Sequence, residues 1–512
     1  MRRIGIDVGG TNTDAVLIDG NRVLFAVKTA TTADVLGGVR TALSKLLAET
    51  AGELGQIAAV VIGTTHFTNA VIERRALQKV GALRIGLPAS ASLPPFVDWP
   101  EDLAALVRGQ VHMVAGGHEY DGREIVPLDV GAIRDAARRM ADAGLTAVGV
   151  TSIFSPLTSE CEREAERILA EEIPNANITL SHELGRIGLL ERENVTLLNA
   201  CLQDLAHETV AAFTEALRGS GLDAPLFLTQ NDGTIMRAET ASRFPVWSFA
   251  SGPTNSMRGA AFLSGLGDAV VVDVGGTTSD IGYLKGGFPR EANAAVEIGG
   301  VRTLFRMPDL LSIGLGGGTE ISADGTQIGP RSVGFRLLEK SLVFGGDTLT
   351  ATDIACAAGR IDLGQRALVA GLSLELVTRC LARTSDMIAE GVDRMKTEAG
   401  DVPLLAVGGG SFLIPDQVEG CSQVIRVEHH AVANAVGAAI AQVSGEVDQI
   451  FSNVTRDQAI AAAQAEAEGR AVAAGAKRES LTLVEMEDIP LSYLPGDARR
   501  VRVRMIGDIG SN

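Results

Sequence analysis

The stretch Ile4–Gly20, IGIDVGGTNTDAVLIDG, is an apolar strand that runs into an aspartate, two glycines and a series of short polar residues. A second stretch, Val270–Gly287, VVVDVGGTTSDIGYLKGG, repeats the pattern in the same order. Glycine has no β-carbon, so backbone N–H groups in such a turn can approach an anion closely. One such turn is an ordinary tight hairpin, but two aspartate-bearing copies in one chain indicate a two-sided phosphate site.

We therefore expect the two turns to hold the phosphates of a nucleotide. A carboxylate repels phosphate unless a hard cation lies between them, so Asp7 and Asp273 are predicted to hold Mg²⁺ or Mn²⁺. The predicted phosphate-binding residues are Gly9, Gly10, Thr11, Asn12 and Thr13 in the first turn and Gly275, Gly276, Thr277 and Thr278 in the second.

Two further glycine-rich turns extend this hypothesis. In LLAVGGGSFLIP (Leu404–Pro415), a strand ends in Gly408, Gly409 and Gly410, where a flat nucleoside ring could approach the backbone. In LSIGLGGGTEI (Leu311–Ile321), Gly316 and Gly317 are predicted to border the terminal phosphate or the substrate. No GxGxxG sequence leads from a strand into a helix and no Walker A loop is present, so a dinucleotide-binding fold and a P-loop are disfavoured.

A short polar segment, GTTHFTN (Gly63–Asn69), follows a predicted strand and begins a predicted helix. Thr65 and His66 are predicted to face the phosphate or the substrate. Helix capping is the alternative role for Thr65. His66 is either a general acid or base, or a structural histidine.

The composition limits the class of protein. The chain has 512 residues, of which 46% are hydrophobic, so we expect more than one domain, each with a real core. Its formal net charge of −18 disfavours binding to nucleic acid and to anionic membranes. The five cysteines are far apart, no apolar signal segment follows Met1, and no apolar run could cross a membrane, so we expect a cytoplasmic protein with reduced thiols.

Short strands and helices alternate along the chain, which predicts an α/β fold. We expect an N-terminal domain over 1–190, a second domain over 191–445 and a C-terminal helix and strand extension over 446–512. Residues 88–128 are rich in proline and polar residues and are predicted to form an irregular inserted loop region or a small subdomain. The final segment, RRVRVRMIGDI (499–509), alternates like an edge strand.

The order of these motifs resembles the actin/hexokinase/Hsp70 ATPase superfamily, in which two ribonuclease-H-like domains enclose one nucleotide. More narrowly, the chain resembles the hydantoinase/oxoprolinase family over nearly its whole length. The blocks that carry this resemblance are, in chain order, IGIDVGGTNTDAVLID, GTTHFTNAVIER, GHEYDGREIVPLD, SHELGRIGLLERENVTLLNA, QNDG, SGPTNSMRGA, DVGGTTSDIGYL and SIGLGGGTEI.

The resemblance implies ATP-dependent opening of a cyclic amide, such as a hydantoin or a 5-oxoproline-like lactam, through phosphorylation of the amide oxygen. It implies ATP and Mg²⁺ (or Mn²⁺) as cofactors, with Asp7 and Asp273 at the metal. The implied partners are a cyclic amide substrate, a second hydantoinase-type subunit encoded nearby, and further copies in an oligomer. Two other functions stay open: a small-molecule kinase of the same superfamily, and an ATP-operated activator of a partner enzyme.

Overall fold

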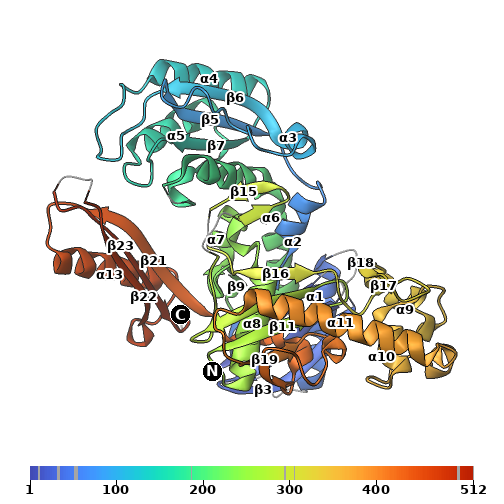
Figure 1. Ribbon diagram of the computed structural model, residues 1–512. Coiled ribbons are helices and arrows are strands. Elements are labelled where there is room, and N and C mark those ends of the chain that lie inside the picture. The colour runs from blue at the N-terminus through green and yellow to red at the C-terminus, as the bar shows by residue number, and fades with distance from the viewer. Residues whose placement is uncertain are drawn as a thin grey trace.

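The computed structural model describes residues 1–9, 12–30, 35–50, 56–185, 187–292, 296–304, 306–492 and 496–510. It contains two similar halves around one site, with one subdomain inserted in the first half and one unit of three strands and a helix projecting from its side (Figure 1). No helix in these ranges is both long and apolar enough to span a bilayer.

The first half begins with the repeated phrase. Strands β1 (Arg2–Val8), β2 (Asn12–Asp19) and β3 (Arg22–Ala30) pair antiparallel in sequence, and β4 (Ile57–Thr64) then pairs parallel with β1. Helix α1 (Val35–Thr50) connects β3 to β4. The resulting order, β3-β2-β1-β4, puts the first glycine turn at the carboxyl end of β1, next to the end of β4.

The second half repeats this arrangement. Strands β11 (Ala269–Val274), β12 (Ser279–Lys285) and β13 (Phe288–Pro289) pair antiparallel, and β19 (Val402–Val407) pairs parallel with β11. Strand β20 (Cys421–Ile425) then adds to β19 and gives the order β13-β12-β11-β19-β20. The α/β prediction with two ribonuclease-H-like halves is confirmed.

The two turns match residue for residue. Asp7 is paired with Asp14 across the first hairpin, and Asp273 is paired with Asp280 across the second. Gly9 N donates to Asn12 O at 3.0 Å, and the second turn has the same hydrogen bond at 2.9 Å, from Gly275 N to Thr278 O. The duplicated sequence is therefore a duplicated structure.

A separate subdomain with its own parallel sheet is inserted after β4, at one end of the molecule (Figure 1). Its strand order is β6-β5-β7-β8, and its helices pack against the sheet over an apolar cluster of their own. The prediction of an irregular region over 88–128 is wrong in part, because that range contains α3 and β6. The elements are β5 (Val80–Leu87), α3 (Glu101–Val107), β6 (Arg108–Ala115), α4 (Val130–Asp142), β7 (Ala147–Ser152), α5 (Glu160–Glu172) and β8 (Asn177–Leu180).

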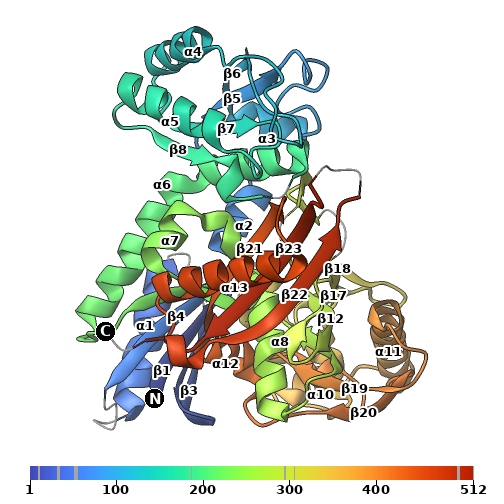
Figure 2. The same cartoon turned by 90° about the vertical axis from the view of Figure 1, so that its left-hand side faces the viewer.

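The last part of the chain returns to the first sheet. Strand β10 (Thr234–Arg237) pairs parallel with β21 (Gln442–Phe451), and β21 pairs with β23 (Arg499–Gly507). Strand β23 lies between β21 and β22 (Thr482–Pro490), so the prediction that it is an edge strand is wrong. Helix α13 (Arg456–Ala473) covers one face of these strands (Figure 2).

The nine-stranded sheet that results has the order β22-β23-β21-β10-β9-β4-β1-β2-β3 and crosses the expected domain boundaries at 190 and 445. Strand β9 (Leu226–Thr229) lies beside β4 although the two are separated in sequence by the whole inserted subdomain. Because long-range packing decides which strands are neighbours in a sheet, the local sequence does not predict that β9 pairs with β4.

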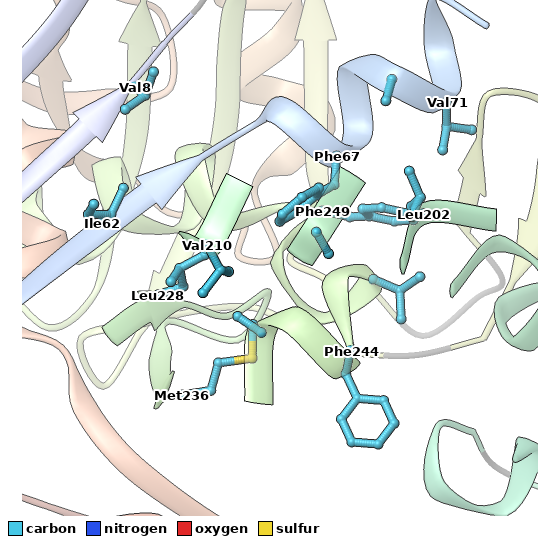
Figure 3. Close-up of a cluster of buried hydrophobic side chains, with 14 of the residues drawn as sticks. Val8, Ile62, Phe67, Val71, Leu202, Val210, Leu228, Met236, Phe244 and Phe249 are labelled. Carbon is cyan, nitrogen blue, oxygen red and sulfur yellow. The ribbon is translucent and has the colours of Figure 1, made fainter. Parts of the chain in front are cut away.

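Helices cover the sheets and form the largest core. In Figure 3, apolar side chains from β1, β4, β9 and the helices around them meet in one cluster. The helices of the two halves are α2 (His66–Ile72), α6 (Leu189–Gly219), α7 (Ala238–Arg243), α8 (Ser251–Ser264), α9 (Leu337–Lys340), α10 (Ala351–Ala357), α11 (Leu374–Met395) and α12 (Ala433–Ile440), and the short strands are β14 (Val296–Ile298), β15 (Val301–Thr303), β16 (Leu310–Ile313), β17 (Thr319–Ile321) and β18 (Ile328–Ser332).

Helices α8 and α12 join the two halves by an unusually close crossing. A β-carbon on Gly259 would lie 2.0 Å from Ala433 O, and a β-carbon on Gly437 would lie 1.9 Å from Asn255 O. Only glycine permits backbones to approach so closely. At this crossing α12 packs on β1 and α8 packs on β11, the strands that lead into the two turns.

Candidate functional site

Asp7 lies at the carboxyl end of β1 and is only 5% exposed. Its Oδ2 accepts a hydrogen bond of 3.2 Å from Asn434 Nδ2 on α12. Burial raises the pKa of Asp7 to about 7, and repulsion from Asp14 and from Asp273 contributes in the same direction. The negative charge of Asp273 therefore makes ionisation of the buried Asp7 less favourable.

Asp273 lies at the same position in the second half. Burial raises its pKa to about 6, with repulsion from Asp280 and Asp14 adding to the shift. The cation that lowers the pKa of both aspartates is Lys28, and its Nζ already contacts Asp14 Oδ1 at 2.7 Å and Asp14 Oδ2 at 2.8 Å. The two halves thus place the negative side chains Asp7 and Asp273 at one site, and Lys28 offsets their repulsion only in part.

This donor set fits a hard divalent cation, because a cation between the two carboxylates would remove their repulsion. No group of three or more His, Cys, Asp or Glu side chains suited to a metal occurs within the described ranges. An all-protein cage is therefore not formed by these residues. Magnesium usually keeps several waters and is held by one or two carboxylates together with phosphate oxygens. Asp7 and Asp273 match that requirement.

The Gly316–Gly318 turn lies directly against the second turn, at Gly275–Thr278. Gly317 N donates to Gly275 O at 3.0 Å, and Gly318 N donates to Gly276 O at 2.7 Å. A β-carbon on Gly316 would lie 2.6 Å from Thr277 N. The structure therefore brings Gly316 and Gly317 together with the second turn, and the side chains of Thr277 and Thr278 remain exposed at its tip.

The predicted nucleoside turn lies beside the same strand. Gly410 N donates to Val274 O at 2.7 Å, and Gly408, with φ 85°, lies against Asp273. Gly409 has no atom within 4 Å of a would-be β-carbon, so this face of the turn is open. A cavity of about 370 Å³ begins next to the turn, and its walls include Phe412, Arg360, Arg426 and His430. An aromatic ring and two guanidinium groups can stack on a flat base.

The first turn is described in part. Gly10 and Thr11 lie outside the described residues, Gly9 closes the hairpin, and Asn12 begins β2. Thr13 is fully buried, and a β-carbon on Gly38 of α1 would lie 2.9 Å from its Oγ1. The Thr13 side chain therefore faces α1, and Thr13 O accepts a hydrogen bond of 3.0 Å from Thr29 Oγ1.

Thr65 and His66 lie beside the first turn, since Thr64 at the end of β4 is in register with Val8. Thr64 Oγ1 accepts a hydrogen bond of 3.1 Å from His66 N, and Asn69 Nδ2 donates to Thr65 Oγ1 at 3.3 Å. The Thr65 side chain makes no cap hydrogen bond to α2, although Thr65 occupies the N-cap position. Burial, with a contribution from Arg75, lowers the pKa of His66, which favours its neutral form.

Two site residues were not predicted. Asn434 lies in the Ala-rich helix α12 and contacts Asp7, and Asn255 on α8 donates to Thr229 Oγ1 at 3.0 Å. A β-carbon on Gly63 would lie 2.4 Å from Asn255 Nδ2 and 3.0 Å from Asp7 Oδ1, so Asn255 also borders the site. For Asn434 the only signal in the sequence was an amide within an otherwise apolar helix, whereas Asn255 lies in the quoted block SGPTNSMRGA.

Family models match most of the chain. The model described as hydantoinase/oxoprolinase N-terminal region matches residues 3–173, and the model described as hydantoinase/oxoprolinase matches residues 192–393. The first match contains β1–β4 and the inserted subdomain except β8, and the second contains the second turn and the Gly316–Gly318 turn.

Curated relatives include the caprolactamase subunit alpha of Pseudomonas jessenii, which is 27% identical over 70% of this chain and 54% of its own length. The acetophenone carboxylase gamma subunit of Aromatoleum aromaticum is 26% identical over 71% of this chain and 54% of its own length. The chain therefore spans about half the length of these relatives.

Two solved structures share the fold. The ATP-dependent caprolactamase from Pseudomonas jessenii superposes with a TM-score of 0.76 at 20% identity, over 99% of this chain and 87% of that one. The nucleotide-free acetone carboxylase structure gives a TM-score of 0.72 at 17% identity, over 100% of this chain and 89% of that one. At these identities the likeness concerns the architecture alone.

Proposed function

Because the chain belongs to the hydantoinase/oxoprolinase family, we propose that it uses ATP to open the ring of a cyclic amide, such as a hydantoin, a 5-oxoproline-like compound or another lactam. The observation that carries this proposal is the pair of matching hairpin turns, in which burial raises the pKa of both Asp7 and Asp273 and the charge of Asp273 adds to the rise at Asp7. One relative, the caprolactamase subunit alpha, supports a lactam as substrate.

Amides resist hydrolysis because resonance weakens the carbonyl as an electrophile. In the proposed reaction the amide oxygen attacks the γ-phosphorus of ATP, the bond to ADP breaks, and ADP leaves. Water then adds to the activated carbon, the ring C–N bond breaks as the nitrogen takes up a proton, and a second water hydrolyses the resulting acyl phosphate to the amino acid and free phosphate. Phosphoryl transfer depends mainly on positioning and charge stabilisation, which is the task we assign to the turns.

The predicted phosphate, nucleoside, metal and polar residues divide by role in this scheme. The backbone N–H groups of the first and second turns hold the phosphates, and Gly408–Gly410 holds the nucleoside. Asp7 and Asp273 hold Mg²⁺ or Mn²⁺, which when bound neutralises charge on the phosphates. Thr65 and His66 lie beside the first turn, where Thr65 can donate to a phosphate oxygen and neutral His66 can accept a proton.

We propose that the chain works with a second subunit and in an oligomer. Three relatives are the alpha subunit of a caprolactamase and the gamma and beta subunits of two carboxylases. The chain spans about half the length of these relatives.

A second candidate function is ATP-dependent carboxylation of a ketone, because two of the relatives are subunits of acetophenone and acetone carboxylases. A lactam and a ketone both present a carbonyl oxygen to the nucleotide. The same site could also serve a kinase that phosphorylates a hydroxyl group, or an activator that closes on ATP.

The test is ADP release by the purified chain, with and without the protein encoded next to it, in the presence of hydantoin, 5-oxoproline, lactams, ketones with bicarbonate, or sugars. Release that depends on a cyclic amide and yields the ring-opened amino acid supports the proposal. A stable phosphorylated sugar would support a kinase, and release that depends on a ketone and bicarbonate would support a carboxylase; either result would overturn the lactam proposal.

A further inference from the structure

Lys28 lies on the same face of the first sheet as two of the site aspartates. Lys28 of β3 is in register with Asp14 of β2, and Asp14 is in register with Asp7 of β1. Residues directly opposite one another on neighbouring strands point their side chains to the same face of a sheet. Asp7, Asp14 and Lys28 therefore form one row across three strands, next to the first turn.

Asp14 holds the ammonium group of Lys28 in place. Lys28 Nζ donates to Asp14 Oδ1 at 2.7 Å and to Asp14 Oδ2 at 2.8 Å. The Asp14 side chain is 9% exposed, so this carboxylate is fixed by its surroundings, whereas the Lys28 side chain is 34% exposed. A lysine ammonium group carries three protons, and in the described part of the chain its hydrogen bonds are the two to Asp14. One proton therefore remains for a ligand.

The charge of Lys28 acts on both halves of the site. It opposes the rise in the pKa of Asp7 in the first half and of Asp273 in the second, although the hydrogen bonds described for Nζ go to Asp14. Coulomb interactions weaken with distance, so an effect on both carboxylates places the ammonium group near the space between them. An anion bound between the two aspartates through a divalent cation would lie close to Lys28 as well.

The second half repeats the aspartates of this row but not the lysine. Asp273 is in register with Asp280, and Asp280 is in register with Ser312 of β16, in the place that Lys28 occupies in the first half. Ser312 Oγ donates a hydrogen bond to Asp280 Oδ1. Serine can make this hydrogen bond but carries no charge. At this position the two halves therefore differ by one positive charge.

This difference between the halves matches the direction of a bound nucleotide. In the proposed site the nucleoside lies at the Gly408–Gly410 turn, which is hydrogen-bonded to Val274 beside the second turn. The phosphate chain then extends from the second half toward the first turn, and the terminal phosphate lies nearest to Lys28. In phosphoryl transfer the charge spreads over the oxygens of the transferred group, and a cation held in position stabilises that charge.

We propose that Lys28 is a catalytic residue, whose ammonium group donates a hydrogen bond to an oxygen of the terminal phosphate of ATP while Asp14 holds the group in position. The same contact distinguishes ATP from ADP, because ADP lacks the phosphate that Lys28 meets. The alternative role is structural, in which Lys28 only neutralises the buried Asp14. The inference rests on the proposed function, since it requires that the two turns bind ATP.

The test compares two nucleotides by calorimetry, with Mg²⁺ and without an acceptor substrate: ADP and the non-hydrolysable β,γ-imido analogue of ATP. Lys28→Met removes the ammonium group but keeps a long side chain. The matched control is Lys45→Met, because Lys45 is exposed on α1 and its replacement changes the net charge by the same amount. The double variant Lys28→Met/Asp14→Asn removes the whole ion pair, so that it leaves no unpaired charge.

We expect Lys28→Met to lose about tenfold or more in affinity for the ATP analogue relative to ADP, whereas Lys45→Met keeps the wild-type ratio of the two affinities. The double variant should show the same loss of selectivity, and it carries the comparison if Lys28→Met does not fold. Equal losses for both nucleotides in Lys28→Met, or wild-type selectivity in the double variant, would show that Lys28 only neutralises Asp14 and would overturn the inference.

Turnover separates this inference from the proposed function. With the acceptor that supports ADP release, Lys28→Met should lower kcat/KM for ATP about tenfold or more, and the double variant should not recover it. Lactam-dependent ADP release that is unchanged in Lys28→Met would refute the role of Lys28 but not the proposed function. A selective loss for the ATP analogue in a protein that acts on a ketone or a sugar would refute the lactam proposal but not the role of Lys28. Failure of wild type to bind either nucleotide would refute both.

Discussion

Gly408 lies directly against Asp273, so that a β-carbon on Gly408 would be 2.2 Å from Asp273 Oδ1 and 2.4 Å from Val274 O. Its φ of 85° is also in the region that favours glycine. The conformation of the Gly408–Gly410 turn and the position of Asp273, the proposed metal ligand, therefore depend on one another.

Replacing Gly408 with alanine should displace Asp273 and weaken Mg·ATP binding at least tenfold. The matched control is Gly409→Ala, since a β-carbon there meets nothing within 4 Å. Nucleotide affinity can be measured by calorimetry on both variants. Equal affinities in the two variants would contradict the predicted link between the turn and Asp273.

Asp7→Asn should abolish Mg·ATP turnover and change how stability depends on pH. The pKa of Asp7 is raised from 3.8 to about 7, so the folded state binds more protons than the unfolded state between these values, and wild-type stability falls as pH rises through that window. Asparagine removes this cost, which is up to ~4 kcal/mol above pH 7.

The measurement is the Tm of the nucleotide-free protein from pH 4 to pH 8. Asp7→Asn should exceed wild type at pH 8, and the difference should shrink toward pH 4. The exposed Asp401→Asn serves as control and should follow wild type. A Tm difference that is constant across this range would show that burial does not raise the pKa of Asp7.

Gly437→Ala should separate the crossing helices α8 and α12. The added methyl group would lie 1.9 Å from Asn255 O, and a backbone atom cannot yield as a flexible side chain can, so we expect a loss of ~3 kcal/mol or more in the free energy of unfolding. Gly469→Ala in α13 meets nothing within 4 Å and should gain up to ~1 kcal/mol. Urea denaturation of the two variants distinguishes these effects, and a Gly437→Ala protein as stable as wild type would refute the crossing.

Arg84 and Glu193 form a buried ion pair that ties the inserted subdomain to α6. Their side chains are 0% and 3% exposed, and Arg84 Nε donates to Glu193 Oε1 at 2.6 Å. Arg84→Met should cost about 3–5 kcal/mol, because it leaves a buried carboxylate unpaired. The double variant Arg84→Met/Glu193→Leu should recover most of this loss in thermal unfolding; a double variant that is no more stable than Arg84→Met would argue against the pairing.

The sequence was sufficient to predict the repeated hairpins, because their features are local: an apolar strand, an aspartate and a glycine turn. It also assigned Gly316 and Gly408 to the same nucleotide site as the two turns, and in the structure both lie beside the second turn through hydrogen bonds and close approaches of their loops. The roles of these residues in binding ATP stay predictions.

What the sequence did not reveal depends on distant neighbours. Asn434 could not be recognised within the Ala-rich helix α12, because nothing in the local sequence indicates that Asn434 contacts Asp7. Glu162 and His182 lie on different elements, α5 and the short turn after β8, and only the fold brings them together. For the same reason the inserted sheet and the position of β23 were missed, because strand order is not a local property.

The pairing of β10 with β21 has a consequence for synthesis on the ribosome. Ile235 is in register with Val443, so the chain must be extended by about 200 residues before β10 acquires this neighbour. At roughly 5–20 residues per second this takes on the order of 10–40 seconds, during which the edge of β10 is open to other chains. The nascent first half is therefore expected to need shielding by a chaperone until its last strands emerge.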